Sequence, residues 1–332
     1  MKVSLLTFGG SLIGTGHLFR CLNIAKWIRL VDDSVEISFH LLDTGIESQH
    51  KALNILKSRT SCQVSIETNE SLSNTCWDIL IVDLLNTPVK IMNYLKGGSN
   101  FLVSIDNTSN SRTFSDININ PLYYKVGEFL ISKNDYIGPQ YHIISPEFYN
   151  TRSYFKNTVK NILIVQGGAD PFNLTYKIIL QLDFIKNKYK EIVLHVITGP
   201  AYSQSKSLLD FNNKKYNNII FHKDVKNMSS FLQNIDLAIS SIGVTAFEIA
   251  SMGIPAIHIT AIEKEIETGQ ALNRLGVSAF SGVYNKTSQD FLQSNISNLI
   301  DNSALRKRMR ASCLHFFNTS CSREMIEKIL RK

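Results

Sequence analysis

The chain has 332 residues, 44% of them hydrophobic and 19% charged, and a formal net charge of +7. A chain of this length forms two domains more often than one, because domains typically have about 100–200 residues. The basic charge gives little support to nucleic-acid binding, since no recognisable nucleic-acid-binding module or aromatic–basic stacking pattern accompanies it. Five scattered cysteines without a C-x-x-C pair indicate neither a disulfide framework nor a zinc knuckle, and they favour a reducing cytoplasm.

The first half of the chain alternates short runs of branched residues with amphipathic segments. The N-terminal run is too short for a signal peptide, so we expect it to form a first buried strand. Amphipathic segments at 17–30 and 49–57 are typical of helices, and the alternation predicts parallel β-α-β units. The strands expected are Val3–Phe8, Val35–Leu42, Ile79–Asp83 and Phe101–Asp106.

The same pattern restarts after a polar and aromatic stretch at 150–160, which predicts a second α/β domain. We expect a first domain at 1–155, a second at 156–302, and C-terminal helices at 303–332 that could cross back to the first. A helix is expected at 172–184. The strands expected in this half are Ile162–Gln166, Ile192–Thr198, Ile219–His222, Leu237–Ser240 and Ala256–Thr260.

The excess positive charge lies mainly in the last 30 residues, where Lys and Arg alternate with apolar residues. We interpret this segment as a solvated helix face, and a peripheral contact with a membrane is the alternative. A transmembrane span is not expected, because the longest apolar run, at 235–262, is interrupted by charged and helix-breaking residues.

Two glycine-rich turns each open a helix. The first is Gly14-Thr15-Gly16-His17 and the second is Ser241-Ile242-Gly243-Val244-Thr245. A helix N-terminus presents backbone N–H groups and partial positive charge, which suit a phosphate. Because both turns follow expected strands, both belong to the edge where open parallel sheets bind ligands. We therefore expect two half-sites facing each other across an interdomain cleft.

His17 is the candidate catalytic base. It falls in the first helical turn, where the helix dipole disfavours a positive charge and favours the neutral imidazole that a base requires. It could take a proton from water or from a sugar hydroxyl. The alternative is that His17 only caps the helix or fills a gap.

The second turn is the candidate nucleotide site. Gly243, Val244 and Thr245 offer N–H groups and a hydroxyl to a diphosphate, and Glu248, about one turn further on, could accept hydrogen bonds from ribose hydroxyls. The alternative is a tight strand-to-helix turn with an ion-paired glutamate.

Gly167 and Gly168 would allow a ligand close approach to the backbone. Asp170 before Pro171 predicts a helix N-cap with proline at the first helical position. The histidines at 142, 195, 222 and 258 lie in or beside expected strands, and no pair has metal-ligand spacing. We therefore expect no metal and no cofactor.

An ordered set of motifs resembles a known family. The motifs are Gly14-Thr15-Gly16-His17-x-x-Arg20-Cys21-Leu22, Gly138-Pro139-Gln140-Tyr141 to Pro146-Glu147-Phe148, Gly167-Gly168-Ala169-Asp170-Pro171, and the stretch from Asp236 to Pro255. Together they are similar to the UDP-sugar hydrolase of pseudaminic acid biosynthesis and to related spore-coat polysaccharide proteins. The second half more distantly resembles the N-acetylglucosaminyl transferase that makes lipid II.

The resemblance implies a GT-B fold: two Rossmann-like, doubly wound parallel-sheet domains with an interdomain cleft. It implies that the C-terminal domain binds UDP, that the N-terminal domain contacts the sugar, and that His17 is the base of a metal-independent reaction. Gly14, Gly16 and Arg20 are then expected at the substrate or its phosphates, together with Gly167, Gly168, Gly243, Val244, Thr245 and Glu248. The chain departs from the family pattern at two sites: Leu85 stands in place of a tyrosine, and Lys264-Glu265 stands in place of an Asn-Gln pair.

Three functions remain open after the sequence analysis. The first is hydrolysis of a UDP-sugar, in the biosynthesis of a surface polysaccharide or a nonulosonic acid, where the sugar could be a diacetamido-trideoxy sugar. The second is glycosyl transfer from the same donor to a glycan or a lipid-linked acceptor. The third is nucleotide-sugar binding without catalysis. The sugar, the acceptor and the oligomeric state are left open.

Overall fold

The computed structural model describes residues 1–10, 14–43, 46–72, 75–107, 109–121, 133–202, 218–317 and 320–332. The chain divides into two compact units, each with its own parallel sheet. Unit 1 is Met1–Pro146 with Thr319–Lys332, and unit 2 is Glu147–Asn318. Within the described residues, no helix is both long and apolar enough to cross a membrane.

Unit 1 contains a seven-stranded sheet in the order β3-β2-β1-β4-β5-β6-β7, and its strands pair in parallel. The strands are β1 (Lys2–Thr7), β2 (Glu36–Leu42), β3 (Gln63–Glu67), β4 (Trp77–Asp83), β5 (Ser99–Ile105), β6 (Ile117–Asn120) and β7 (Asp135–Ile137). The helices are α1 (Gly16–Val31), α2 (Ile46–Arg59), α3 (Asn69–Leu72), α4 (Val89–Gly97) and α13 (Ser320–Leu330).

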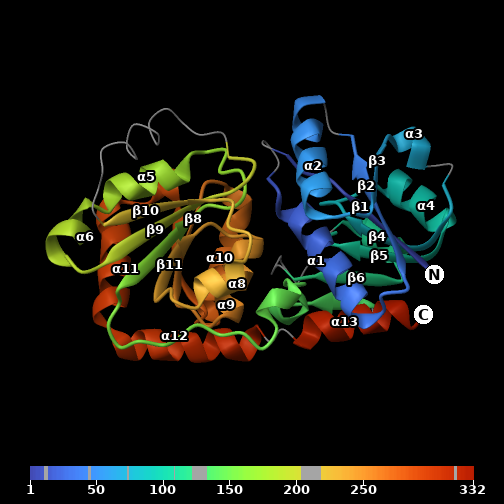
Figure 1. Cartoon of the computed structure of the whole chain (residues 1–332). Helices are drawn as coiled ribbons and strands as arrows, with labels where there is room; N and C mark the ends of the chain where they lie inside the picture. The colour runs from blue at the N-terminus through green and yellow to red at the C-terminus, as the bar shows by residue number, and fades with distance from the viewer. Residues whose placement is uncertain are drawn as a thin grey trace. The chain divides into compact units, whose positions relative to one another are not determined.

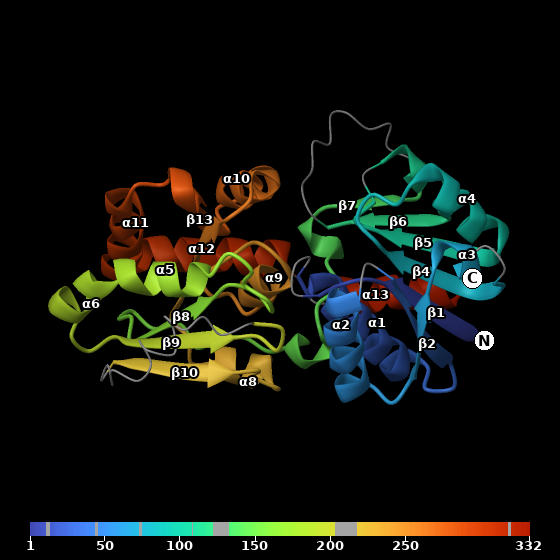
Figure 2. The same ribbon diagram turned by 90° about the horizontal axis from the view of Figure 1, so that it is seen from above.

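The core of unit 1 follows from the alternation of side chains along its strands. Leu6 of β1 and Leu80 and Val82 of β4 pack with Met92 and Leu95 of α4. The two views in Figures 1 and 2 place α1 and α2 on one face of this sheet and α3 and α4 on the other. A parallel sheet buried on both faces has near-continuous apolar strands, as found here.

The last helix, α13, belongs to unit 1, where it packs along α1. Its Met325, Ile326 and Ile329 side chains are buried. The hydroxyl of Ser322 accepts a hydrogen bond from the Ile144 amide and donates to the carbonyl of His142. The return of the chain terminus therefore fixes the segment that follows β7.

Unit 2 contains a six-stranded parallel sheet in the order β10-β9-β8-β11-β12-β13. The strands are β8 (Asn161–Val165), β9 (Val193–Thr198), β10 (Ile219–Lys223), β11 (Leu237–Ser240), β12 (Ala256–Thr260) and β13 (Ser278–Val283). The helices are α5 (Leu174–Gln181), α6 (Asp183–Lys188), α8 (Met228–Leu232), α9 (Val244–Ser251), α10 (Ile266–Arg274), α11 (Gln289–Asp301) and α12 (Ser303–Phe316).

Both sheets reverse their strand order at one position. In unit 1 this position lies between β1 and β4, and in unit 2 it lies between β8 and β11. Helices that leave neighbouring strands on opposite sides open a crevice beyond the carboxyl ends of those strands, and such crevices bind ligands in open α/β sheets. The glycine turn after β1 and the glycine turn after β11 both begin at these positions.

The interpretation of the C-terminal basic segment as a solvated face is wrong for two arginines of α12. Arg306 is buried and donates hydrogen bonds to the carbonyls of Leu299 and Ile300 at the end of α11. Arg310 donates to the carbonyl of Gly253 and to Ser153. Both guanidinium groups therefore donate to backbone carbonyls inside unit 2 and do not belong to a solvated helix face.

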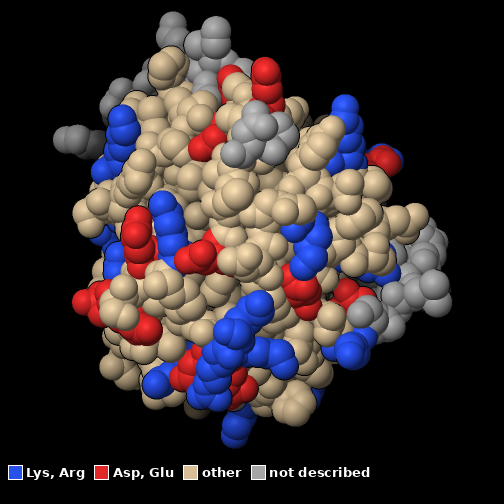
Figure 3. Space-filling view, turned by 90° about the vertical axis from the view of Figure 1, so that its right-hand side faces the viewer, with Lys and Arg blue, Asp and Glu red and all other residues tan. Residues whose placement is uncertain are grey.

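The basic residues of α13 follow the sequence interpretation more closely. Arg323, Lys328, Arg331 and Lys332 are exposed, and Arg323 and Arg331 form ion pairs with Glu327. Figure 3 shows a group of basic side chains near the lower edge of one face, with acidic side chains among them. Such mixed charge is typical of a solvated surface.

Candidate functional site

The glycine turn of unit 1 connects β1 to α1. Gly10 and Gly14 exchange two backbone hydrogen bonds of 2.9 Å, and α1 begins two residues later at Gly16. Gly14 has φ +93°, a conformation that side chains rarely adopt, so the turn itself requires glycine there. This geometry places His17 in the first turn of α1, beyond the carboxyl ends of β1 and β4.

His17 contacts a carboxylate that the sequence analysis did not assign to the site. Its Nδ1 atom lies 2.7 Å from Oδ1 of Asp83, the last residue of β4. The imidazole also lies against the ring of Phe8, with ring centroids 4.6 Å apart. The side chain of His17 is 17% exposed, whereas that of Asp83 is fully buried. A buried carboxylate thus orients a partly accessible imidazole.

Arg20 connects this pair to a second carboxylate. Its Nε and Nη2 atoms donate to Oδ2 and Oδ1 of Asp83 at 2.7 and 2.6 Å, which is a bidentate pair. Nη2 also donates to Oδ2 of Asp106 at 2.5 Å. Asp106 follows β5, the strand next to β4, so the sheet brings the two carboxylates together.

The electrostatics of the cluster favour its ionised form. Burial alone would raise the pKa of Asp83, but the charge of Arg20, the contact with His17 and their hydrogen bonds hold that pKa well below its usual range. Burial also opposes the charge of Arg20, yet Asp106 and Asp83 raise its pKa above the ordinary value. Asp83 is therefore a carboxylate, and Arg20 a guanidinium cation, at neutral pH.

The prediction that Arg20 lies at the substrate or its phosphates stays a prediction, and the structure gives this side chain internal partners. The residue is 3% exposed, and the hydrogen bonds of its Nε and Nη2 atoms go to Asp83 and Asp106. A phosphate would have to replace two carboxylates that already neutralise this buried cation. The spacing His17-x-x-Arg20 puts the two side chains on one helix face, but sequence spacing does not show what lies opposite that face.

A metal ion would compete with Arg20 for its place in this cluster. Among the described residues, His17, Asp83 and Asp106 form a group that could hold a metal ion, because their potential ligand atoms lie within 4.8 Å of one another. Nη2 of Arg20 contacts all three residues. The cation that these groups surround is therefore the guanidinium of Arg20.

In unit 2, the backbone of the turn after β8 packs directly against the backbone of the turn after β9. Gly167 has φ +75°, and a Cβ on Gly199 would lie 2.4 Å from the Cα of Gly168. Turn geometry thus explains the glycine at 167, and close packing explains the glycine at 199, without any ligand. The prediction that Gly167 and Gly168 approach a phosphate stays a prediction.

Asp170 caps α5 as the sequence predicted, but Pro171 is not the first helical residue. Its two carboxylate oxygens accept hydrogen bonds from the amides of Leu174 and Thr175 at 2.8 and 2.9 Å. The helix begins at Leu174, because Asp170 and Asn173 adopt positive φ angles and delay it. The helix expected at 172–184 is instead divided into α5 and α6.

The turn after β11 differs from the turn after β8. Gly243 has φ 169°, which is extended backbone open to any residue, and a Cβ built there would meet no atom within 4 Å among the described residues. Neither backbone conformation nor packing therefore requires a glycine. The space beside Gly243 adjoins the first amides of α9, those of Val244 and Thr245, which have no helical carbonyl four residues earlier.

Glu248 lies one turn further along α9 than Thr245 and is partly exposed. Residues three and four positions apart share a helix face, so Val244, Thr245 and Glu248 lie on the same side of α9. The prediction that these residues form a nucleotide half-site stays a prediction. Both alternatives for Glu248, a ribose ligand and an ion-paired residue, remain open.

Buried polar side chains support the strand ends beneath this turn. His258 of β12 is buried, and its Nδ1 lies 3.0 Å from the hydroxyl of Ser240, the last residue of β11. Burial lowers the pKa of His258 to about 4, so this histidine is neutral, as expected for a core residue. Two glutamates that follow β12 also have partners: Thr260 donates to Glu265, and Lys286 pairs with Glu263.

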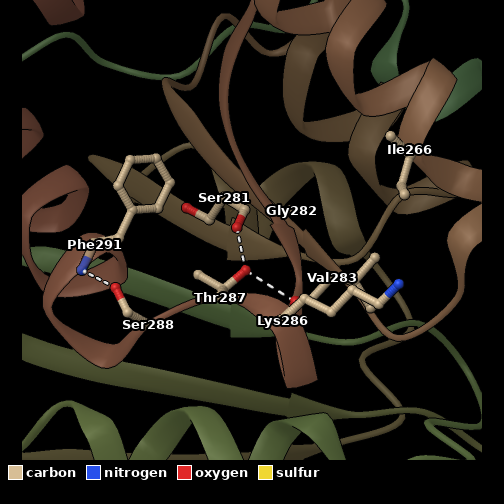
Figure 4. A pocket seen from close by; sticks show the side chains of 8 residues that line it. All are labelled: Ile266, Ser281, Gly282, Val283, Lys286, Thr287, Ser288 and Phe291. Carbon is tan, nitrogen blue, oxygen red and sulfur yellow. Dashed lines mark hydrogen bonds between the residues drawn. The ribbon is translucent and has the colours of Figure 1, made fainter.

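A hollow of about 510 Å³ lies elsewhere in unit 2, beside β13 and the start of α11. Figure 4 shows Thr287 directed toward the strand end, where it donates to the carbonyl of Val283, and Ser288 accepting from the amide of Phe291. These hydroxyls serve the turn and the helix cap. None of the residues predicted from the sequence as site residues lines this hollow.

Comparisons with known proteins agree with this architecture. Residues 162–324 match the family model described as the glycosyltransferase family 28 C-terminal domain, which corresponds to most of unit 2. The spore coat polysaccharide biosynthesis protein SpsG of Bacillus subtilis is 20% identical over 313 residues, which cover 92% of this chain and 91% of SpsG. An uncharacterised protein of Methanocaldococcus jannaschii is 28% identical over 284 residues, 80% of this chain and 57% of the archaeal protein.

Solved structures extend the likeness to the whole chain. The crystal structure of MurG from Acinetobacter baumannii superposes with a TM-score of 0.69, at 14% identity and full coverage of both chains. The complex of Staphylococcus aureus MnaA with UDP gives a TM-score of 0.63 at 10% identity, covering 99% of this chain and 95% of MnaA. At such identities the likeness is one of fold. The expected pair of parallel-sheet α/β domains of the GT-B type is confirmed, and the family 28 match indicates an enzyme of the glycosyltransferase type.

Proposed function

We propose that this chain hydrolyses a UDP-linked sugar at the anomeric carbon and releases UDP, within the biosynthesis of a surface polysaccharide or a nonulosonic acid. The observation that carries the proposal is the contact of His17 with Asp83. A buried carboxylate on Nδ1 leaves Nε2 as the ring nitrogen that can accept a proton. Similarity to SpsG supports the polysaccharide context.

In the proposed step, Nε2 of His17 takes a proton from a water molecule as the water oxygen bonds to the anomeric carbon. The bond between that carbon and the β-phosphate oxygen breaks, and UDP leaves with the electron pair. The configuration at the anomeric carbon is inverted, because a single displacement occurs. Asp83 stabilises the imidazolium that forms, as a carboxylate on the far ring nitrogen does.

Unit 2 would bind the nucleotide in this proposal. The amides of Val244 and Thr245 and the hydroxyl of Thr245 would stabilise the negative charge that develops on the departing diphosphate. Glu248 would accept hydrogen bonds from the ribose. The family 28 match spans this turn, which supports placing the nucleotide here. The proposal assigns no metal and no cofactor to the reaction.

The experiment measures UDP release from UDP-N-acetylglucosamine and from a UDP-diacetamido-trideoxyhexose, with no acceptor present. We expect wild-type protein to release UDP from one of them and His17→Ala to be at least about 10²-fold slower, with nearly unchanged affinity for UDP. His315→Ala is the matched control, because His315 is exposed on α12 of unit 2. Equal turnover by wild type and His17→Ala would remove His17 from the mechanism.

Glycosyl transfer is the second candidate, favoured by the match to a glycosyltransferase family. In that reaction His17 would deprotonate an acceptor hydroxyl rather than water, and the roles in unit 2 would not change. The same assay separates the two functions, because a transferase releases UDP only after a glycan or lipid-linked acceptor has been added.

A further inference from the structure

The hydrogen atoms of Arg20 determine which nitrogen of His17 carries a proton. Nη2 of Arg20 has two hydrogens and three acceptors nearby: Oδ1 of Asp83 at 2.6 Å, Oδ2 of Asp106 at 2.5 Å and Nδ1 of His17 at 3.1 Å. The two carboxylate oxygens are closer and are charged, so they take both hydrogens. No hydrogen of Nη2 is then left for the imidazole.

His17 can therefore make its own short contact only as a donor. Nδ1 lies 2.7 Å from Oδ1 of Asp83, and a carboxylate accepts hydrogen bonds. The neutral ring thus carries its hydrogen on Nδ1, and the lone pair is on Nε2. If Arg20 instead donated to Nδ1, the neutral ring would carry its hydrogen on Nε2 and could not act as a base there.

Asp106 is the residue that prevents this second arrangement. It takes the Nη2 hydrogen that would otherwise be available to His17, and its own amide donates to the carbonyl of Ile119, which fixes it at the end of β5. Its other oxygen, Oδ1, is buried without a hydrogen-bond partner among the described residues. A buried oxygen left unsatisfied is unfavourable, so packing alone does not explain this carboxylate.

We propose that Asp106 is a positioning residue that acts through Arg20: it occupies the second Nη2 hydrogen and so reserves Nδ1–H of His17 for Asp83. In this arrangement Asp106 acts on the imidazole through its hydrogen bond with Arg20. The kinetic consequence of the inference rests on the proposed role of His17 as a base, whereas the tautomer itself does not.

The test is ¹⁵N NMR of protein labelled in its histidines, at pH 8, where an ordinary imidazole is neutral. The chemical shifts of the two ring nitrogens identify the tautomer, and the spectrum of His17→Gln assigns the signals of His17 among the eight histidines. We expect the Nδ1–H tautomer in wild type. A wild-type ring with its hydrogen on Nε2 overturns the proposal whether or not the protein has any enzymatic activity.

Two variants of Asp106 complete the test. Asp106→Asn retains an oxygen that can accept the Nη2 hydrogen, so it is expected to keep the wild-type tautomer, whereas Asp106→Ala is expected to populate the Nε2–H form. In the UDP-release assay, Asp106→Ala should lower kcat at least about tenfold with little change in KM, and Asp106→Asn should restore most of it. Identical imidazole signals in folded Asp106→Ala and Asp106→Asn contradict the proposal. If Asp106→Ala does not fold, Asp106→Val, which also lacks an acceptor, takes its place in the comparison.

Discussion

Replacing Asp83 by asparagine should reduce both the stability of unit 1 and the turnover of the enzyme. The substitution keeps the size of the side chain but removes its charge and one acceptor oxygen. Asp83 accepts hydrogen bonds from Nε and Nη2 of Arg20 and from Nδ1 of His17. The single oxygen of asparagine can replace Oδ1 or Oδ2 but not both, so its NH₂ group would face a donor nitrogen at the other position.

The magnitude follows from the burial of the pair. Removing one partner of a buried ion pair typically costs about 3–5 kcal/mol, because it leaves an uncompensated charge. Here Asp106 still faces Arg20, so we expect a loss of about 3 kcal/mol in the free energy of unfolding, at the lower end of that range. Turnover should fall at least about 10²-fold, because the imidazole loses the carboxylate that orients it.

The dependence on pH gives a second check. The folded-state pKa of Asp83 is depressed, so its contribution to stability is fully present above the unfolded pKa of about 3.9 and is lost as pH falls through the folded value. The difference between wild type and Asp83→Asn should therefore be constant from about pH 5 to 8 and should shrink only below about pH 4.

Urea unfolding followed by tryptophan fluorescence measures this effect in unit 1, because both tryptophans, Trp27 and Trp77, are buried there. Asp33→Asn is the matched control, since the Asp33 carboxylate forms an exposed pair with Arg29 and its loss should change stability by less than about 0.5 kcal/mol. A loss below about 1 kcal/mol in Asp83→Asn would refute the reasoning from the buried pair.

Two predictions concern the nucleotide half-site. Gly243→Ala should leave the unfolding free energy within about 0.5 kcal/mol of wild type, because its Cβ meets open space, yet calorimetry should show at least about tenfold weaker UDP binding. Gly199→Ala is the contrasting variant: its Cβ would lie 2.4 Å from the Cα of Gly168, so it should destabilise unit 2. Equal UDP affinity in Gly243→Ala and wild type would argue against a ligand at the turn after β11. Glu248→Ala should weaken UDP binding by roughly 1–3 kcal/mol through the lost hydrogen bonds to ribose, and unchanged affinity would leave the ion-pair interpretation.

Much of the fold can be predicted from the sequence because long apolar strands and amphipathic helices carry their own periodicity. The runs Ile79–Asp83 and Leu237–Ser240, for example, lie in β4 and β11. The sequence analysis did not predict β3, β6, β7 or β13. These strands are short, polar in part or at a sheet edge, and their pairing depends on neighbours that are distant in sequence.

The candidate site could be predicted only as far as the glycine turns and His17. Asp83 and Asp106 each end an expected strand, and this position indicates a place at the ligand-binding edge of the sheet. That both contact Arg20 could not be predicted, because it depends on β4 and β5 being neighbours in the sheet. The buried state of Arg306 was equally hidden, since its carbonyl partners belong to the end of another helix. Tertiary neighbours, rather than local pattern, decide whether an arginine is a ligand or an internal partner.

In the proposed reaction, water activated by His17 attacks the anomeric carbon of the sugar. Hydrolysis in ¹⁸O-labelled water, with mass spectrometry of both products, tests it most directly. We expect ¹⁸O in the released sugar and none in UDP, with incorporation at least about 10²-fold slower in His17→Ala. Label in UDP would show attack at phosphorus and would contradict the proposed reaction. Labelling of the sugar at an equal rate in wild type and His17→Ala would contradict the role of His17.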